Sequence, residues 1–288
     1  MTADADAARS VGLTGAKLAM EIRARVAVLA AALAEAGRLP RLAVVVATAD
    51  ESTAWYVRSI AAAASKVEIA CEIVDLGGAT TGEEIAATLR RLSGDPSVHG
   101  IILQTPLPSG VSLAQAASAI DPDKDVDGAS PSSLGWLAAG LRAFPPATAQ
   151  AVIALLDHHG LPISGRHAVV VGRSTVVGKP VAHLLLDRDT TVTICHSRTT
   201  NLAEMTRRAD VLVAAVGRAG LIGRDHVSPS TVVIDVGTNA TEDGGLARDV
   251  DAEVEGHVAA LTPVPGGVGP VTVALLLEHT IRAADEAG

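Results

Sequence analysis

Short apolar runs alternate in this chain with longer stretches of helical character, and this alternation constrains the fold more than any other feature. Residues 42–46, 70–76 and 100–103 form the first three runs, and stretches of helical character occupy residues 52–67 and 82–92 between them. Buried strands joined by helices favour a parallel sheet with right-handed crossovers. We therefore expect an α/β fold in the first part of the chain.

A second alternation follows a segment, residues 109–148, that is rich in Pro, Gly, Ser and Asp. We expect the domain boundary in this segment, because such residues interrupt regular structure, and a bridging helix at residues 149–158 directly after it. The expected elements beyond this point are strands at residues 167–171, 191–195, 211–215 and 232–235 and helices at residues 177–186 and 202–208.

The fold class expected from the two alternations is α/β with two lobes. An N-terminal α/β domain comprises residues 1–147 and opens with a helix at residues 14–36. A Rossmann-type domain comprises residues 148–270. The C-terminal helix, within residues 271–288, is expected to pack back on the first domain.

The composition argues against several classes of function. The 288 residues include 32 acidic and 23 basic side chains, but only two Trp, one Tyr and one Phe, so a nucleic-acid partner is not expected. The two cysteines, Cys71 and Cys195, form no CxxC motif, and we expect neither a disulfide nor a metal site. Without an apolar run of bilayer length or a secretory signal pattern, the chain is expected to be cytoplasmic, with a small-molecule partner.

A glycine-rich turn after the strand at residues 167–171 is the first candidate binding feature. It reads GRSTVVG, from Gly172 to Gly178, and leads into a helix. Bare backbone followed by the unpaired N–H groups of a helix N-terminus suits a diphosphate, although a tight connection alone would also explain the glycines.

The end of the following strand indicates which dinucleotide would bind. Where NAD enzymes usually carry an acid for the ribose hydroxyl, this chain has Ser197 and Arg198, and Arg173 lies within the glycine-rich turn. A hydroxyl and two cations suit the 2′-phosphate of NADP, so NADP is the expected cofactor. The alternative is that both arginines are solvated surface charges.

Several further segments resemble one family in order and spacing over nearly the whole chain. They are Tyr56 near the start of a helix, GIILQTPLP at residues 100–108, DPDKDVDG at 121–128, IDVGTN at 234–239 and TPVPGGVGP at 262–270. With GRSTVVG, they are similar to the methylenetetrahydrofolate dehydrogenase/cyclohydrolase (FolD) family. The resemblance implies an N-terminal catalytic domain, an NADP-binding Rossmann-type domain and a homodimer.

The resemblance also implies an activity in one-carbon metabolism. Members of this family oxidise 5,10-methylenetetrahydrofolate with NADP and then hydrolyse the resulting methenyl compound. The residues that match the family's catalytic and folate-binding positions are Tyr56, Gln104, Asp125, Pro265, Gly266 and Gly267. Those that match the NADP contacts or follow from the turn above are Gly172, Arg173, Ser174, Ser197, Arg198 and Thr238.

One departure from the family pattern affects the chemistry. The pattern YVxxK places a lysine one helical turn after the tyrosine, whereas this chain has Ile60 there. Isoleucine cannot transfer a proton, so we predict an NADP-dependent dehydrogenase with weak or lost cyclohydrolase activity. Lys66 and Arg58 lie on other faces of the helix, and Lys124 is a remote substitute.

Two alternatives remain open from the sequence. The chain is either a FolD-like paralogue that acts with NADP on another imine or iminium compound, or a ligand-binding homologue without turnover.

Overall fold

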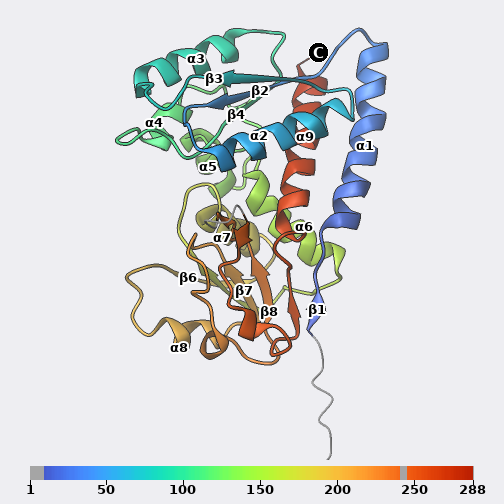
Figure 1. The fold of residues 1–288 in the computed structure, drawn as a ribbon. Coiled ribbons are helices and arrows are strands. Elements are labelled where there is room, and N and C mark those ends of the chain that lie inside the picture. Colours follow the sequence, from blue (N-terminus) through green and yellow to red (C-terminus); the bar gives the residue numbers. More distant parts are fainter. Residues whose placement is uncertain (1–9, 241–244, 288) are drawn as a thin grey trace, which may run out of the picture. The chain divides into compact units, whose positions relative to one another are not determined.

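The computed structural model describes residues 10–240 and 245–287 (Figure 1). The chain divides into two compact units. We call residues 17–150 with 271–288 the three-stranded unit, and residues 1–16 with 151–270 the six-stranded unit, after the sheet in each.

The three-stranded unit is built on a parallel sheet of order β3-β2-β4. Its strands are β2 (Arg41–Val46), β3 (Ala70–Asp75) and β4 (Gly100–Leu103), and β2 and β4 are apolar and almost wholly buried. Helices α2 (Glu51–Ser65) and α3 (Gly82–Gly94) provide the crossovers between them. The predicted parallel α/β arrangement is therefore confirmed.

Five further helices contribute to this unit wholly or in part. They are α1 (Ala16–Glu35), α4 (Leu113–Ala117), α5 (Pro131–Ala138), α6 (Ala147–His158) and α9 (Val268–Glu286). Helices α1 and α9 run side by side (Figure 1), and an Arg25 guanidinium nitrogen lies 3.0 Å from Oε1 of Glu278. Residues 271–287 thus belong to the same compact unit as residues 17–150.

The six-stranded unit has a parallel sheet of order β1-β11-β8-β7-β5-β6. Its strands are β1 (Val11–Gly12), β5 (His167–Val171), β6 (Thr191–Cys195), β7 (Val211–Ala214), β8 (Val232–Asp235) and β11 (Ala260–Leu261). Helices α7 (Gly178–Leu186) and α8 (Leu202–Thr206) are followed by an antiparallel pair, β9 (Asn239–Ala240) with β10 (Leu246–Ala247), and by short 3₁₀ turns at Arg224–His226 and Ala252–Val254.

The N-terminal strand β1 belongs to the six-stranded unit, whereas the predicted domain boundary assigned it to the first domain. Residues 10–16 were expected in the first domain, but Val11 and Gly12 pair with β11 at the edge of the six-stranded sheet. The backbone N–H groups of Val11 and Leu13 donate to carbonyl oxygens of residues 259 and 261, at 3.0 and 2.9 Å. These bonds satisfy backbone groups at the edge of the sheet, and they explain why the segment groups with the second unit.

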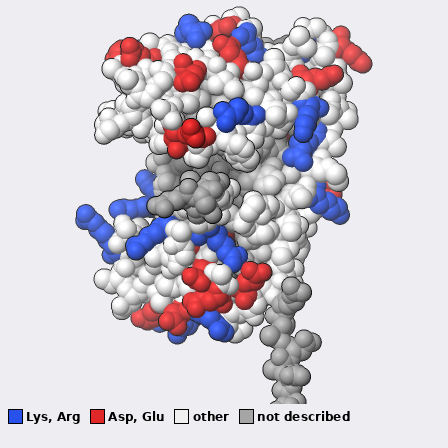
Figure 2. All heavy atoms as spheres, in the orientation of Figure 1, with Lys and Arg blue, Asp and Glu red and all other residues white. Residues whose placement is uncertain are grey.

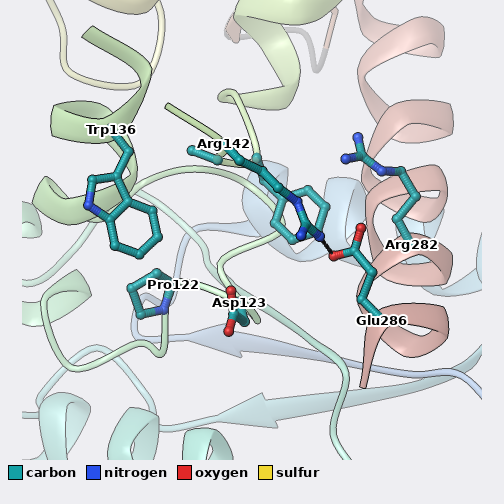
Figure 3. Close-up of a pocket in the computed structure, with 8 residues that line it drawn as sticks. Pro122, Asp123, Trp136, Arg142, Arg282 and Glu286 are labelled. Carbon is teal, nitrogen blue, oxygen red and sulfur yellow. Dashed lines mark ion pairs between the residues drawn. The ribbon is translucent and has the colours of Figure 1, made fainter. Parts of the chain in front are cut away.

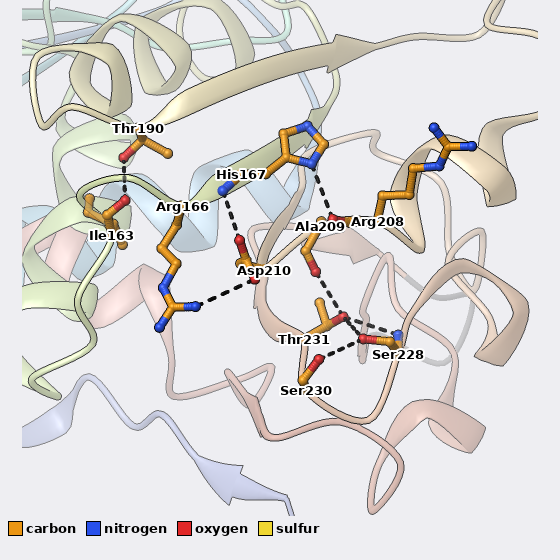
Figure 4. A network of polar contacts seen from close by, with 10 residues as sticks. All are labelled: Ile163, Arg166, His167, Thr190, Arg208, Ala209, Asp210, Ser228, Ser230 and Thr231. Atoms are coloured by element: carbon orange, nitrogen blue, oxygen red, sulfur yellow. Dashed lines mark hydrogen bonds and ion pairs between the residues drawn. The ribbon is translucent and has the colours of Figure 1, made fainter.

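Polar side chains tie together the N-terminal ends of the strands in the six-stranded unit (Figure 4). Asp210, just before β7, accepts the backbone N–H of His167 at 2.9 Å. Thr231, just before β8, donates its hydroxyl to the Ala209 carbonyl oxygen at 3.1 Å. These contacts lie at the N-terminal ends of the strands. The opposite, carboxyl ends carry the loops where ligands bind in such sheets.

The surface carries charges of both signs. On the face drawn in Figure 2, acidic and basic side chains are interspersed among a larger number of neutral residues. No helix among the described residues is both long and apolar enough to cross a membrane.

Candidate active site

Helix α2 presents the predicted tyrosine at the edge of its buried face. Asp50 caps the helix by accepting the Thr53 N–H at 2.8 Å, which sets where the first turn begins. Tyr56 is half-buried, and its pKa is raised by burial and by the negative charge of Asp127. The hydroxyl is therefore neutral and lies within electrostatic reach of that carboxylate.

Ile60, one turn after Tyr56, is fully buried. It belongs to the apolar stripe of α2 together with Val57 and Ala64. The position where the family pattern has lysine is therefore a packing position in this chain, occupied by a side chain that can neither donate nor accept a proton.

None of the cations considered as substitutes takes over this position. Lys124 donates its ammonium to the carbonyl oxygens of Ser93 and Asp95, at 2.9 and 2.7 Å. These two acceptors lie at the C-terminal end of α3, where a cation is favoured. Lys66 is the exposed C-cap residue of α2, and Arg58 is also exposed.

Gln104 follows β4 directly at the carboxyl end of the sheet. Its backbone N–H donates to the Val45 carbonyl oxygen at 2.9 Å, which extends the pairing with β2. The side chain is half-buried, and its Nε2 donates to the Thr105 carbonyl oxygen at 2.9 Å. The amide is therefore near the expected place but bound to neighbouring backbone, and its oxygen remains a possible acceptor for a ligand.

Asp125, the predicted substrate carboxylate, is fully buried and bonded to its own chain. Its oxygens accept the N–H groups of Ala129 and Ser130, at 3.0 and 2.9 Å, and the Ser133 hydroxyl at 2.6 Å. A carboxylate bound by three donors stabilises the turn that leads into α5. This environment supports a structural role and argues against the predicted contact with substrate.

Asp127, which the sequence reasoning missed, is the half-buried carboxylate next to it. Its Oδ1 accepts the Ala147 N–H at 3.4 Å. Burial, together with the negative charge of Asp125, raises its pKa to about 7. The loop is shaped by Gly128, with φ of +56°, where a Cβ would lie 2.6 Å from the Pro146 nitrogen.

The glycine-rich turn of the six-stranded unit has the geometry of a phosphate cradle. Gly172 has φ of +134°, and a Cβ there would overlap the Ala215 carbonyl oxygen. A Cβ at Gly178 would lie 2.8 Å from the Arg173 nitrogen, so both glycines are required by the backbone itself. Ser174 Oγ accepts the Val177 N–H at 3.2 Å and the Gly178 N–H at 3.3 Å, and thereby caps the start of α7.

Four predicted cofactor residues are solvent-exposed around this turn. Arg173 and Ser174 lie within it, and Ser197 and Arg198 follow β6. Neither arginine forms an ion pair with any other residue that the structure describes. Two guanidinium groups without an ion-pair partner among the described residues suit a phosphate monoester. Thr238 is exposed in the loop after β8.

Two buried carboxylates that the sequence reasoning missed shape the loops after β7 and β8. Asp249 accepts three consecutive backbone N–H groups, those of residues 216–218, at 2.7, 3.1 and 2.9 Å. Asp235 accepts the N–H groups of Gly237 and Val250, both at 2.9 Å, and burial raises its pKa to about 6. These bonds hold the loops that carry Thr238 in one conformation.

The predicted folate-facing glycines form a tight turn in the six-stranded unit. Gly266 has φ of +107°, and its carbonyl oxygen accepts the Gly15 N–H at 2.8 Å. A Cβ at Gly267 would lie 2.7 Å from the Pro263 carbonyl oxygen. The chain's own geometry therefore requires both glycines, and Pro265 precedes them on the same turn.

One surface pocket has none of these residues in its lining. It is lined by Pro122, Asp123, Trp136, Arg142, Phe144, Arg282 and Glu286 among others (Figure 3). An ion pair between Arg142 and Glu286 crosses it. It contains none of the predicted site residues, and the described residues offer no group of three metal-ligating side chains.

Comparison with known proteins identifies the family that both units match. The model for the catalytic domain of tetrahydrofolate dehydrogenase/cyclohydrolase matches residues 13–127, and the model for its NAD(P)-binding domain matches residues 146–288. The bifunctional protein FolD 1 of Saccharopolyspora erythraea is 66% identical over 273 residues, which cover 94% of this chain and 93% of that protein.

Solved structures give the same result. The bifunctional enzyme FolD of Campylobacter jejuni superposes with a TM-score of 0.91 at 36% identity, covering 96% of this chain and 99% of that one. The Trypanosoma brucei dehydrogenase-cyclohydrolase, solved with NADP and an inhibitor, has a TM-score of 0.90 at 34% identity, with 96% and 98% covered.

Proposed function

The chain belongs to the tetrahydrofolate dehydrogenase/cyclohydrolase family, and on that premise we propose that it is an NADP-dependent 5,10-methylenetetrahydrofolate dehydrogenase with weak or lost cyclohydrolase activity. Family membership supports the reaction class, and the residues of the two units support its details. The folate is the proposed small-molecule substrate. A cytoplasmic location and a homodimer remain predictions from the sequence.

The cofactor half of the proposal rests on the cradle at Gly172 and on the exposed Arg173 and Arg198. NADP, when bound, supplies the hydride acceptor. The glycine-rich turn admits the diphosphate, and Arg173 and Arg198 are the partners we assign to the 2′-phosphate. Ser174, Ser197 and Thr238 would supply hydroxyl contacts around them.

The substrate half of the proposal rests on Tyr56, Gln104 and Asp127. We transfer the predicted pterin contact from Asp125 to Asp127, because Asp125 already binds three donors whereas Asp127 has one long backbone contact. A carboxylate suits the paired N–H donors of a pterin, and the neutral Tyr56 ring offers an apolar face beside it. Hydride transfer itself needs positioning of the bridge carbon and no protein base.

A single observation carries the loss of cyclohydrolase activity, namely the full burial of Ile60. Addition of water to the methenyl carbon requires proton transfer, and the family pattern assigns this work to a lysine at that position. Lys124 is bonded to carbonyl oxygens and Lys66 lies at the helix end, so neither lysine supplies an ammonium group in its place.

The test follows NADPH formation and the methenyl chromophore during incubation with methylenetetrahydrofolate and NADP. We expect NADPH to form and methenyltetrahydrofolate to accumulate, with hydrolysis no faster than in buffer. Rapid conversion to 10-formyltetrahydrofolate would refute the loss of cyclohydrolase activity. Tight NADP binding without NADPH would favour the paralogue that acts on another imine, and binding of neither ligand would contradict both enzymatic readings.

A further inference from the structure

A buried histidine on the C-terminal helix holds the loop that carries Asp127. His279 lies on α9 and is fully buried. Its Nδ1 lies 2.7 Å from the carbonyl oxygen of Val126, the residue directly before Asp127, and its Nε2 lies 2.7 Å from Oε1 of Gln150 on α6.

The chemistry of these two contacts assigns the protons. A carbonyl oxygen only accepts, so Nδ1 must carry the hydrogen that is donated to Val126. Burial lowers the pKa of His279 to about 4, with Arg282 contributing in the same direction, so the ring is neutral and Nε2 accepts. The partner at Nε2 is then the amide N–H of Gln150, whose two terminal atoms exchange places by a simple flip.

The loop is confined on its other side as well. The Val126 side chain packs against Gly100, where a Cβ would lie 3.0 and 3.1 Å from the two valine methyl groups. The Phe144 ring packs against the imidazole with centroids 5.1 Å apart, and the Arg282 guanidinium lies over the Phe144 ring, 5.3 Å from its centroid. The Phe144 ring also lines the pocket of Figure 3.

The two segments joined by His279 are the two that hold Asp127. The Val126 carbonyl belongs to the peptide group whose nitrogen is that of Asp127, so fixing this oxygen fixes the backbone from which the carboxylate projects. Gln150 lies in the first turn of α6, whose first residue, Ala147, donates to the Asp127 carboxylate at 3.4 Å.

We propose that His279 is a positioning residue for the substrate subsite: it ties the Val126–Asp127 peptide to the first turn of α6 and thereby aims the Asp127 carboxylate. The proposal rests on the assignment of Asp127 to the folate in the proposed function. His279 touches neither of the reactants in this scheme and acts only through Asp127.

Two substitutions separate positioning from simple packing. His279→Leu fills similar space without a donor, whereas His279→Asn places an amide N–H close to the position of Nδ1 and keeps the bond to Val126. We expect His279→Leu to raise KM for methylenetetrahydrofolate about tenfold with kcat changed less than about threefold, and His279→Asn to restore KM to within about threefold of the parent. Binding of NADP, which the other unit provides, should not change.

The control is His257→Leu, the same chemical change at a half-buried histidine of the six-stranded unit, which should leave both KM values as they are. If His279→Leu does not fold, His279→Gln makes the same comparison with His279→Asn, because its longer amide reaches the Nε2 position and leaves the Val126 oxygen without a donor. Equal KM values for His279→Asn and for the variant without a donor to Val126, either His279→Leu or His279→Gln, would overturn the proposal.

A second readout needs no turnover and keeps the two proposals apart. In protein labelled with ¹³C at aspartate carboxyl carbons, Asp127 should titrate near 7 in the parent and in His279→Asn, and closer to the ordinary range in His279→Leu. An unchanged titration in the Leu variant would refute the role of His279 even if the parent oxidises methylenetetrahydrofolate. A parent without that activity would refute the proposed function, while the titration would still decide the role of His279.

Discussion

Replacing Ile60 by lysine tests the central chemical claim, that this chain lacks one proton-transferring group and little else. The Ile60 side chain is fully buried in the apolar stripe of α2, one helical turn from Tyr56. A lysine there would extend its ammonium along the stripe toward the half-buried Tyr56 and the charge of Asp127. We expect Ile60→Lys to create cyclohydrolase activity in a dehydrogenase.

The environment of Ile60 sets both the gain in hydrolysis rate and the loss of stability expected for Ile60→Lys. A positioned general acid or base contributes about 10²- to 10⁴-fold, so methenyl hydrolysis should rise at least about a hundredfold. The lysine stem retains much of the apolar contact of the isoleucine. The branched methyl group of the isoleucine is lost, however, and the new ammonium group is partly desolvated. We expect a cost of about 2–4 kcal/mol, which corresponds to a Tm lower by about 5–15 °C for a unit of this size.

The assay measures the decay of methenyltetrahydrofolate at fixed pH with no NADP present, so that hydrolysis is separated from oxidation. The matched control is Ile60→Met, a volume-conserving change that should cost less than about 1.5 kcal/mol and leave hydrolysis at the level of buffer. Dehydrogenase kcat should remain within about threefold of the parent in both variants.

Two results would refute the reasoning. If the parent hydrolyses methenyltetrahydrofolate rapidly and Ile60→Met leaves that rate unchanged, another group performs the proton transfer. If Ile60→Lys folds, binds NADP and oxidises methylenetetrahydrofolate without any gain in hydrolysis, the pocket has lost more than the lysine.

Four further predictions concern the remaining site residues. Asp127→Asn should weaken folate binding about tenfold or more. The pKa of Asp127 in the folded parent, about 7, exceeds the ordinary value of 3.8, so the stability of the parent falls as pH rises from about 4 to 7. Urea melts of the variant at different pH values should lack this slope. Asp125→Asn should instead lower stability by about 1–3 kcal/mol with a smaller effect on folate affinity, as denaturant melts and ligand titration would show. Arg198→Ala should weaken NADP binding about tenfold and leave NAD binding unchanged in a fluorescence titration, and equal losses for both cofactors would contradict its assignment to the 2′-phosphate. Gly172→Ala should abolish NADP binding because its Cβ overlaps the Ala215 carbonyl oxygen, whereas Gly94→Ala, at a glycine with open space around it, should bind NADP normally.

Hydrophobic patterning was sufficient to predict the longer strands of both sheets. The predicted strands at residues 167–171, 191–195 and 232–235 match β5, β6 and β8 at both ends, because each is a short apolar, β-branched run that begins after a polar residue. The two-residue strands β1 and β11 were missed, since two residues show no periodicity and their pairing depends on segments about 250 positions apart.

Helices α4 and α5 lie in the segment that was expected to be a connection between domains. Here the composition misled, because Ser, Pro and Gly also mark helix starts. Ser130 accepts the Ser133 N–H at 3.1 Å, and Pro131 occupies the first helical position. That cap signal was present in the sequence and could have identified α5.

The proposed transfer of the pterin contact from Asp125 to Asp127 shows what the motifs alone could not predict at the site. Both acids belong to one DVDG string, and a resemblance of motifs gives no information on which of them is buried. The difference arises from tertiary contacts, namely the start of α5 against Asp125 and the start of α6 near Asp127. Whether a carboxylate can bind a ligand depends on how many hydrogen-bond donors of its own chain it already accepts.

The identity of residue 60 and the protonation of Asp127 are linked by the same electrostatics. The pKa of Asp127 is raised by burial and by Asp125, and the one group that opposes this shift is the Ala147 N–H. A positive charge one turn from Tyr56 would favour the ionised carboxylate, whereas Ile60 adds only apolar surface. The pKa of Asp127 near 7 is therefore what burial and Asp125 produce without a cation at position 60. In this chain folate affinity should depend on pH through Asp127 itself, and a lysine at position 60 should move that dependence to lower pH.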